Sequence, residues 1–188
     1  MPSIFSHAVA AAAIGAALGP ARVPARCLVG GALLAALPDA DVAGFALGVR
    51  YQDMLGHRGL SHSLAFAAAA ALVATALVRG ADHPRGSRRW LLAYFFLATA
   101  SHGVLDGFTN GGLGVAFWAP FDGRRYFFPF RPIQVSPIGV GAFFTRRGAR
   151  VIASELVWIW APSMVVMLVA WWRWRRALTP RVAPPSSA

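Results

Sequence analysis

The sequence predicts an all-α integral membrane bundle of about five helices. Apolar residues make up 57% of the 188 residues and charged residues only 13%, and the mean hydropathy is +0.54, which is typical of a membrane protein. Apolar runs recur along the chain, separated by short polar clusters and arginines. We expect one membrane-embedded domain over residues 1–177 and a disordered tail over residues 178–188.

The net charge is +11, and all 18 of the lysine and arginine residues are arginine. In a soluble protein, this charge would indicate nucleic-acid binding. Here the arginines lie between apolar runs, as they do in the loops of membrane proteins. We therefore expect the arginines to contact membrane lipids and expect no nucleic-acid partner. Cys27 is the single cysteine, which excludes an intrachain disulfide.

Four apolar runs precede residue 79, and glycines, prolines or polar residues bound them. We expect helices or short helical runs over Ala8–Gly19, Cys27–Leu37, Val42–Val49 and Leu64–Val78. The first run resembles the core of a signal peptide but lacks a basic region before it, so we expect it to be retained. Ser61 or Ser63 offers a side-chain cap for the fourth run.

Two further helices are predicted in the second half of the chain. One covers Trp90–Leu105, and the other covers Val151–Trp172, in which Glu155 is the only charge and Pro162 predicts a kink. Between them, residues 107–150 contain glycines, prolines and aromatic residues that oppose a long helix. The aromatic rings suit the membrane interface, and a turn at Asp122-Gly123 predicts a short hairpin.

Alternating helix directions would bring every polar cluster to one end of the bundle. Most apolar runs are shorter than the roughly 20 residues that a bilayer requires, so the polar ends would lie near one membrane face. The Arg79–Arg89 loop and the Arg173–Arg176 stop would lie at the other end. The end with the Arg79–Arg89 loop would carry ten arginines, and the end with the polar clusters would carry eight. The positive-inside rule then favours a site on the extracytoplasmic face.

The polar clusters hold residue types that bind metals. Unpaired imidazole and carboxylate groups cost several kcal/mol in apolar surroundings, and ionisable groups inside membranes are candidates for functional sites. The seven candidate ligands are His7, Asp39, Asp41, His57, His62, His102 and Asp106. Seven ligands exceed one tetrahedral site and fit two ions, or one ion with surrounding partners. Mixed nitrogen and oxygen ligands favour Zn, with Mn or Fe as alternatives, and disfavour Ca.

Spacing explains how several of these side chains would meet. His102 and Asp106 are four residues apart and share a helix face, although a core histidine bonded to a nearby aspartate has the same spacing. Asp39 and Asp41 would share a face in extended backbone or form a turn that caps a helix. His7 could instead be a simple cap or interface residue.

The second polar cluster needs a turn to bring its histidines together. His57 and His62 would converge if the chain turned through Gly59 into a helix that starts near Ser61. Between them, Arg58 suits a bidentate grip on a phosphate or carboxylate. Its simpler role is as the counter-ion of Asp53 or Asp39.

The motifs resemble a known family of membrane-bound, metal-dependent hydrolases, also described as LexA-binding, inner-membrane-associated hydrolases. They are Ser6-His7, LPDAD (37–41), GHRGLSHS (56–63), SHGVLDGFTNGG (101–112) and WAPF (118–121). A more distant similarity links them to zinc-dependent phospholipase C. The resemblance covers His7 to about Pro137 and implies that all seven candidate ligands form the site. It also implies catalytic roles for Arg58 and Asp106, and a bacterial or archaeal cytoplasmic membrane location.

One position departs from the family pattern. The family usually has a further histidine after its second aspartate, where this chain has Val42.

The leading functional hypothesis is hydrolysis of an anionic phosphoester or lipid-like substrate by metal-activated water near one membrane face. A metal or proton transporter is an alternative, and its ligands would lie near the membrane midplane. A second alternative is a regulatory membrane protein with a structural metal and a protein partner at its arginine-rich loops. An open coordination position would separate a catalytic metal from a structural one.

Overall fold

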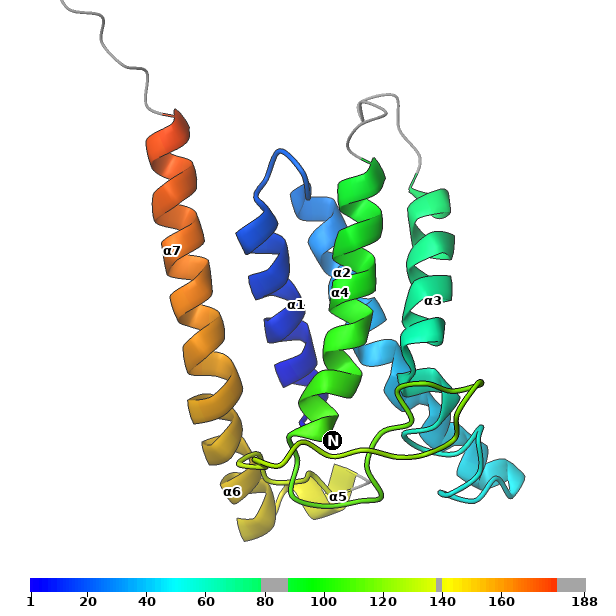
Figure 1. Cartoon of the computed structure of the whole chain (residues 1–188). Coiled ribbons are helices and arrows are strands. Elements are labelled where there is room, and N and C mark those ends of the chain that lie inside the picture. Colours follow the sequence, from blue (N-terminus) through cyan, green and yellow to red (C-terminus); the bar gives the residue numbers. More distant parts are fainter. Residues whose placement is uncertain (79–87, 138–139, 179–188) are drawn as a thin grey trace, which may run out of the picture.

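The computed structural model describes residues 1–78, 88–137 and 140–178 and confirms the predicted all-α membrane bundle. Helices α1, α2, α3 and α4 pack side by side, and α7 lies along the outer side of α1 (Figure 1). The helical elements are α1 (Ile4–Leu18), α2 (Ala25–Ala36), η1 (Leu37–Leu47), η2 (Leu60–His62), α3 (Leu64–Leu77), α4 (Arg88–Gly107), α5 (Val140–Phe143), α6 (Arg146–Glu155), η4 (Leu156–Trp160) and α7 (Ala161–Leu178).

Two helical stretches, Ala25–Leu47 and Arg146–Arg176, are long and apolar enough to cross a membrane by length and composition. Helices α1 and α3 are also apolar but shorter. Large apolar side chains such as Leu33, Leu72 and Val165 are exposed on the outside of the bundle. Such an apolar exterior is expected where lipid, rather than water, surrounds the protein.

The last helix is longer than Val151–Trp172, because α6, η4 and α7 follow one another without a break. The segment Leu156–Trp160 is π-helical and ends two residues before Pro162. Proline has no backbone N–H and cannot continue the regular hydrogen-bond ladder. The predicted irregularity at this proline therefore takes the form of a π-helical turn.

The prediction of extended backbone at Asp39 and Asp41 is wrong. Both residues lie in the 3₁₀ helix η1, which continues directly from α2 and ends at Gly48 with a φ of +82°. Pro38 does not stop the helical path because it occupies the first turn of η1, where a missing N–H costs little. The short run predicted at Val42–Val49 thus begins earlier, at Leu37.

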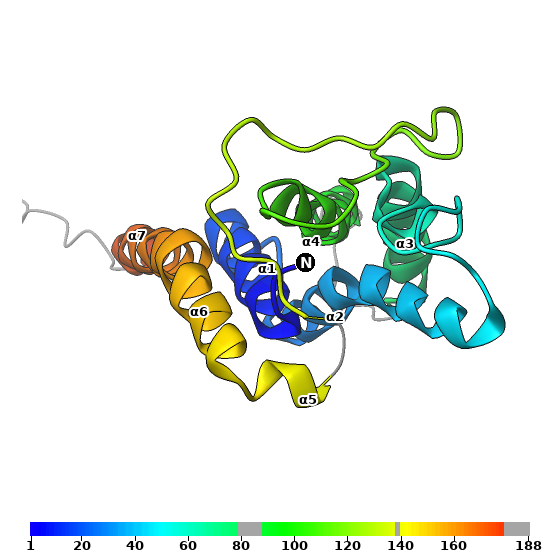
Figure 2. The ribbon, with the colours of Figure 1, turned by 90° about the horizontal axis from the view of Figure 1, so that it is seen from below.

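The predicted hairpin around Asp122-Gly123 reduces to a single antiparallel bridge, in which Val115 and Tyr126 exchange two hydrogen bonds of 2.9 Å. The described residues contain no longer strand. The amides of Ala119 and Phe121 bond to Ala116 and Trp118, so the segment forms tight turns instead of a ladder. This loop crosses the end of the bundle that holds the N-terminus (Figure 2).

The elements gather at the two ends of the bundle as the alternating helix directions predict. The turn between α1 and α2, the start of α4 and the end of α7 lie together at one end, while η1 and α6 lie at the other (Figure 1). Most of the predicted Arg79–Arg89 loop, residues 79–87, lies outside the described residues. So does the predicted tail, apart from Leu178, which ends α7.

Small residues let the central helices approach closely. The core of the bundle includes Ala11, Ala35, Ala71 and Ala98, packed around the fully buried Tyr94. Helix α2 faces Tyr94 through Gly31, where an added Cβ would lie 2.1 Å from the tyrosine hydroxyl oxygen. The bundle therefore depends on glycine at this contact.

We predict opposite effects for two adjacent glycines of α2. Gly31→Ala forces the buried Tyr94 to move and should lower the free energy of unfolding by about 1–3 kcal/mol, as overpacking does. Gly30→Ala meets Phe95 at an ordinary 3.4 Å and should leave stability unchanged or raise it by up to about 1 kcal/mol. Unfolding titrations in detergent would measure both, and equal effects would contradict this packing.

Candidate metal centre

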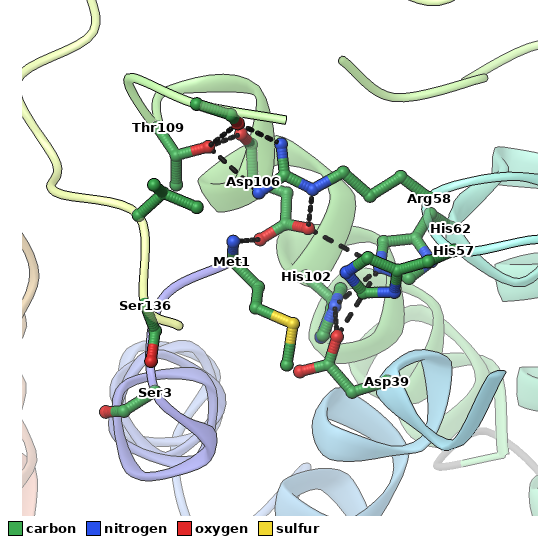
Figure 3. A network of polar contacts seen from close by, with 12 residues as sticks. Met1, Ser3, Asp39, His57, Arg58, His62, His102, Asp106, Thr109 and Ser136 are labelled. Carbon is green, nitrogen blue, oxygen red and sulfur yellow. Dashed lines mark hydrogen bonds and ion pairs between the residues drawn. The ribbon is translucent and has the colours of Figure 1, made fainter. Parts of the chain in front are cut away.

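Six of the seven candidate ligands meet at one end of the bundle in two adjoining groups. The first group is Asp39, His62, His102 and Asp106, and the second is Asp41, His57 and His62. Within each group the candidate ligand atoms lie within 4.8 Å of one another. His62 belongs to both groups, and several of these side chains are seen together in Figure 3.

Short helical segments aim these side chains at one another. Helix α4 presents His102 and Asp106 from its last two turns, one helical turn apart. The loop before α3 turns at Arg58, whose φ is +64°, and passes into η2. Ser63 then caps α3 by accepting a hydrogen bond from the amide of Phe66, which confirms one of the two predicted caps.

The ring of His102 has a defined orientation. Its Nδ1 lies 2.7 Å from the carbonyl oxygen of Ala35, and because a carbonyl only accepts, Nδ1 carries the hydrogen. The Nε2 of the neutral ring therefore presents a lone pair. This Nε2 lies 3.1 Å from Asp39 Oδ1. A backbone carbonyl that fixes a histidine tautomer in this way is the usual partner of a metal-binding imidazole.

The tautomer of His62 is fixed by its contact with Ser61. Ser61 Oγ donates to Asp41 Oδ2 at 2.6 Å and lies 2.9 Å from His62 Nδ1. With its hydrogen used, the serine oxygen accepts from Nδ1–H. The Nε2 of a neutral His62 then also presents a lone pair, 3.0 Å from the Nε2 of His102.

Four acceptor atoms consequently face one another in a buried space. His62 Nε2 lies 3.6 Å from Asp39 Oδ1 and 3.4 Å from Asp106 Oδ2. Among the described residues, no carboxylate oxygen of Asp39 or Asp106 receives a well-aligned hydrogen bond. Acceptors this close repel one another unless a cation lies between them. A tetrahedral ion with bonds of about 2.0–2.2 Å holds its ligands about 3.3–3.6 Å apart, so these residues fit a zinc-like ion.

Without a metal, a proton can take the place of the cation. Burial disfavours the charged form of His62, but contacts with the carboxylates of Asp106, Asp39 and Asp41 outweigh burial and raise its pKa to about 10. At neutral pH the metal-free ring is therefore protonated. A metal ion and this proton would compete for the same nitrogen.

Arg58 lies in a different environment from the one predicted for a substrate clamp. It is fully buried, and its Nε lies 2.9 Å from Asp106 Oδ2. Its other two nitrogens donate to Gly111 O at 2.8 Å and to Thr109 Oγ1 at 3.0 Å. Arg58 thus holds Asp106 and the following loop in place, and neither Asp39 nor Asp53 is its partner in an ion pair.

The second group borders a cavity of about 400 Å³. His57 Nδ1 donates to Asp41 Oδ1 at 2.7 Å, and His57 lines the cavity together with Tyr51, Arg58 and Arg147. Arg125 donates to the carbonyl of His57 at 2.8 Å and to that of Tyr51 at 3.1 Å, which fixes this wall. The cavity places basic side chains beside the histidine and carboxylate groups.

His7 belongs to neither group of candidate ligands. Its ring is fully buried and stacks on His102 with a centroid distance of 3.8 Å. Neither ring nitrogen has a hydrogen-bond partner among the described residues. In this structure His7 therefore supports the ring of His102, because α1 brings it alongside the ring and not among the converging acceptors.

Sequence reasoning missed three polar residues around the centre. Ser61 orients His62, and Thr109 receives Arg58 while donating to the carbonyl of Asp106 at 2.7 Å. Glu155 is buried and accepts hydrogen bonds from the backbone and hydroxyl of Ser3 and from Ser6. The single acidic residue within an apolar helix could have signalled this last network.

Comparisons with known proteins agree on a membrane family. Residues 1–178 match the model of the family described as YdjM inner membrane protein. The chain is 40% identical over 175 residues to inner membrane protein YbcI of Escherichia coli (strain K12). The aligned region covers 93% of this chain and 100% of that protein. No solved structure matches. The membrane prediction is confirmed, whereas hydrolysis and LexA binding appear in neither name and stay predictions.

Arg58→Ala should destabilise the protein by about 3–5 kcal/mol, because it leaves the buried Asp106 without its counter-ion. Arg58→Lys should recover only part of this loss, since one ammonium group cannot replace the planar fork. The control Arg124→Ala removes a surface ion pair with Asp122 and should cost much less, because solvent screens such a pair. Unfolding in detergent measures all three, and equal losses for Arg58→Ala and Arg124→Ala would contradict the structural role.

Metal binding should release a proton. Below a pKa of about 10 the metal-free His62 is protonated, so the apparent affinity for Zn²⁺ should rise by about tenfold per pH unit across neutrality. Calorimetric titration in two buffers with different ionisation enthalpies would count the protons released. Binding that is independent of pH and buffer would show that His62 is not a ligand.

Proposed function

The chain belongs to the YdjM inner membrane protein family, and we propose that it is a membrane-embedded, metal-dependent hydrolase of anionic phosphoester or lipid-like substrates. The metal centre uses Asp39, His62, His102 and Asp106, with Asp41 and His57 beside it. Zinc is the proposed ion, with one or two bound. The bundle crosses the inner membrane several times, and its centre faces the extracytoplasmic side.

One observation carries this proposal. The Nε2 atoms of His62 and His102 lie 3.0 Å apart, and the Nδ1 hydrogen of each ring is used elsewhere. Two lone pairs in contact, next to two buried carboxylates, require a positive charge between them, which a proton or a metal ion can supply. Divalent ions satisfy such a mixed set of nitrogen and oxygen ligands.

The cavity beside the second group supports the substrate class. Its wall includes His57 and two arginines, Arg58 and Arg147. The guanidinium of Arg58 is engaged with the protein, so Arg147, which is exposed, is the arginine that can pair with a phosphate or carboxylate. The residues that line the cavity come from the N-terminus, the loops and α6. The N-terminus and α6 lie at one end of the bundle and not at its middle (Figure 1), as expected for a substrate that arrives at the membrane face.

Each residue around the proposed centre has a role that follows from its position. When bound, a divalent ion supplies Lewis-acid activation of water and of a phosphoryl oxygen. His57 donates its Nδ1 hydrogen to Asp41 and keeps a lone pair on Nε2, which can accept a proton from water at the cavity wall. Arg58 holds Asp106 in place, and Arg147 binds the anionic group of the substrate. Asp106 therefore acts as a ligand and Arg58 as a positioning residue.

A structural metal is the second candidate. The first group offers four protein ligands in a fully enclosed space, which is typical of a closed structural site. The second group borders a cavity, which is typical of a catalytic site, but its His57 and His62 use their Nδ1 hydrogens in hydrogen bonds to Asp41 and Ser61. Transport receives less support, because the candidate ligands come from η1, from the loop and η2 before α3, and from the last turns of α4, whereas a transport site would lie near the middle of the helices.

The experiment measures metal content and hydrolysis on the same purified protein in detergent. Elemental analysis should find bound zinc, and a screen of phosphoesters and phospholipids should find hydrolysis. We predict that His102→Ala loses both metal and turnover, because it removes one ligand. The control Asp122→Asn, which removes the charge of a partly exposed carboxylate in a loop, should keep both.

A substrate variant separates catalysis from metal binding. We predict that Arg147→Gln keeps its metal and binds an anionic substrate at least about tenfold more weakly, since a charge-assisted hydrogen bond is worth about 1.5–3 kcal/mol. The neighbouring Arg146→Gln is the matched control and should have little effect. A stable metal without hydrolysis across the screen would favour the structural role, and full metal in His102→Ala would refute the centre.

A further inference from the structure

The end of the bundle opposite the metal centre contains a built contact between α7 and α1. Trp174 Nε1 donates to the carbonyl of Ala16 at 3.1 Å. The indole also lies against Gly19, whose φ is +91° and where an added Cβ would lie 2.3 Å from the ring. Trp174 thus fills the space between α7 and the end of α1.

Two apolar cavities flank this tryptophan. One, of about 220 Å³, is lined by residues of α7 and α1 that include Val165, Val169 and Arg173. The other, of about 320 Å³, is lined by residues that include Leu28, Met167 and Arg175. Trp174 lines both cavities. Each cavity is therefore an apolar recess with one arginine in its wall, and the indole of Trp174 is common to both.

The surroundings of these cavities are strongly basic. Arg22 lies 4.5 Å from the ring centre of Trp90 and 5.9 Å from that of Trp174, and Arg176 stacks on Trp172 at 3.6 Å. Among the described residues, the aspartates lie in or near η1, the loops or the end of α4 at the metal-centre end, and Glu155 ends α6. This end consequently has a positive field at the level of the tryptophans, where headgroups lie.

We propose that an anionic glycerophospholipid binds here, with an acyl chain on each side of Trp174 and its phosphate within reach of Arg173 and Arg175, which line one recess each. Two apolar recesses and a pair of arginines match a molecule with two chains and one phosphate. Basic pockets between membrane helices recognise anionic headgroups in this way. A helix of a partner protein does not fit both recesses, because the indole of Trp174 forms part of both walls. The site is separate from the metal centre and does not depend on hydrolysis.

The test compares lipid retention by native mass spectrometry after purification in detergent and titration with phosphatidylglycerol or phosphatidylcholine. The wild-type protein should retain phosphatidylglycerol at least tenfold more tightly than phosphatidylcholine or the single-chain lysophosphatidylglycerol. The double variant Arg173→Gln with Arg175→Gln should lose this preference. The variant with lysine at both positions should keep most of it, because the charge remains.

A matched control removes two exposed arginines at the other end, Arg146→Gln with Arg150→Gln, and should leave the preference unchanged. Equal retention of the anionic and zwitterionic lipids by the wild-type protein would overturn the proposal. An equal loss in the control pair would also overturn it, since net charge would then explain binding. Undiminished retention of lysophosphatidylglycerol would refute the two-chain arrangement.

Discussion

The close approach of His62 and His102 is the constraint on which the rest of the site depends. Their Nε2 atoms lie 3.0 Å apart with two carboxylates beside them, and this arrangement is stable only with a positive charge among the four acceptors. The surrounding contacts serve this geometry: Ala35 and Ser61 fix the two rings, and Arg58 fixes Asp106. A proton or a divalent ion can supply the charge, so in the proposed centre the two would compete for the same nitrogen atoms.

The bundle gives these side chains a rigid frame. Helix α4 lies at its centre and contacts α1, α2 and α3, so its last two turns are held from several sides. Small residues bring α2 within reach of Tyr94, and this close packing places the carbonyl of Ala35 beside His102. The network of Glu155 with Ser3 and Ser6 attaches the long last helix to the start of α1. Packing inside the membrane and polar contacts at its face therefore determine the site together.

The two ends of the molecule have different chemistry. One end gathers aspartates and histidines around a buried centre and an adjacent cavity with arginine in its wall. The other gathers tryptophans and arginines around apolar recesses. This division follows the alternation of helices, since each turn of the chain returns polar residues of one kind to the same face. One end therefore suits contact with lipid headgroups, and the other suits the proposed metal centre.

The sequence by itself determined the helical class, the approximate helix positions and the meeting of the polar clusters at one end. Apolar runs and helix-breaking residues encode these features locally, and chain alternation needs no knowledge of packing. The spacing of His102 and Asp106 also predicted a shared helix face correctly.

Only the tertiary structure decided the role of each polar residue. His7 stacks on His102 outside the ligand groups, and Arg58 pairs with Asp106 because the chain turns at positive φ and buries the guanidinium. Asp39 and Asp41 point into different groups because η1 is helical and not extended. These assignments depend on distances between segments far apart in the chain, and sequence spacing contains no information about those distances.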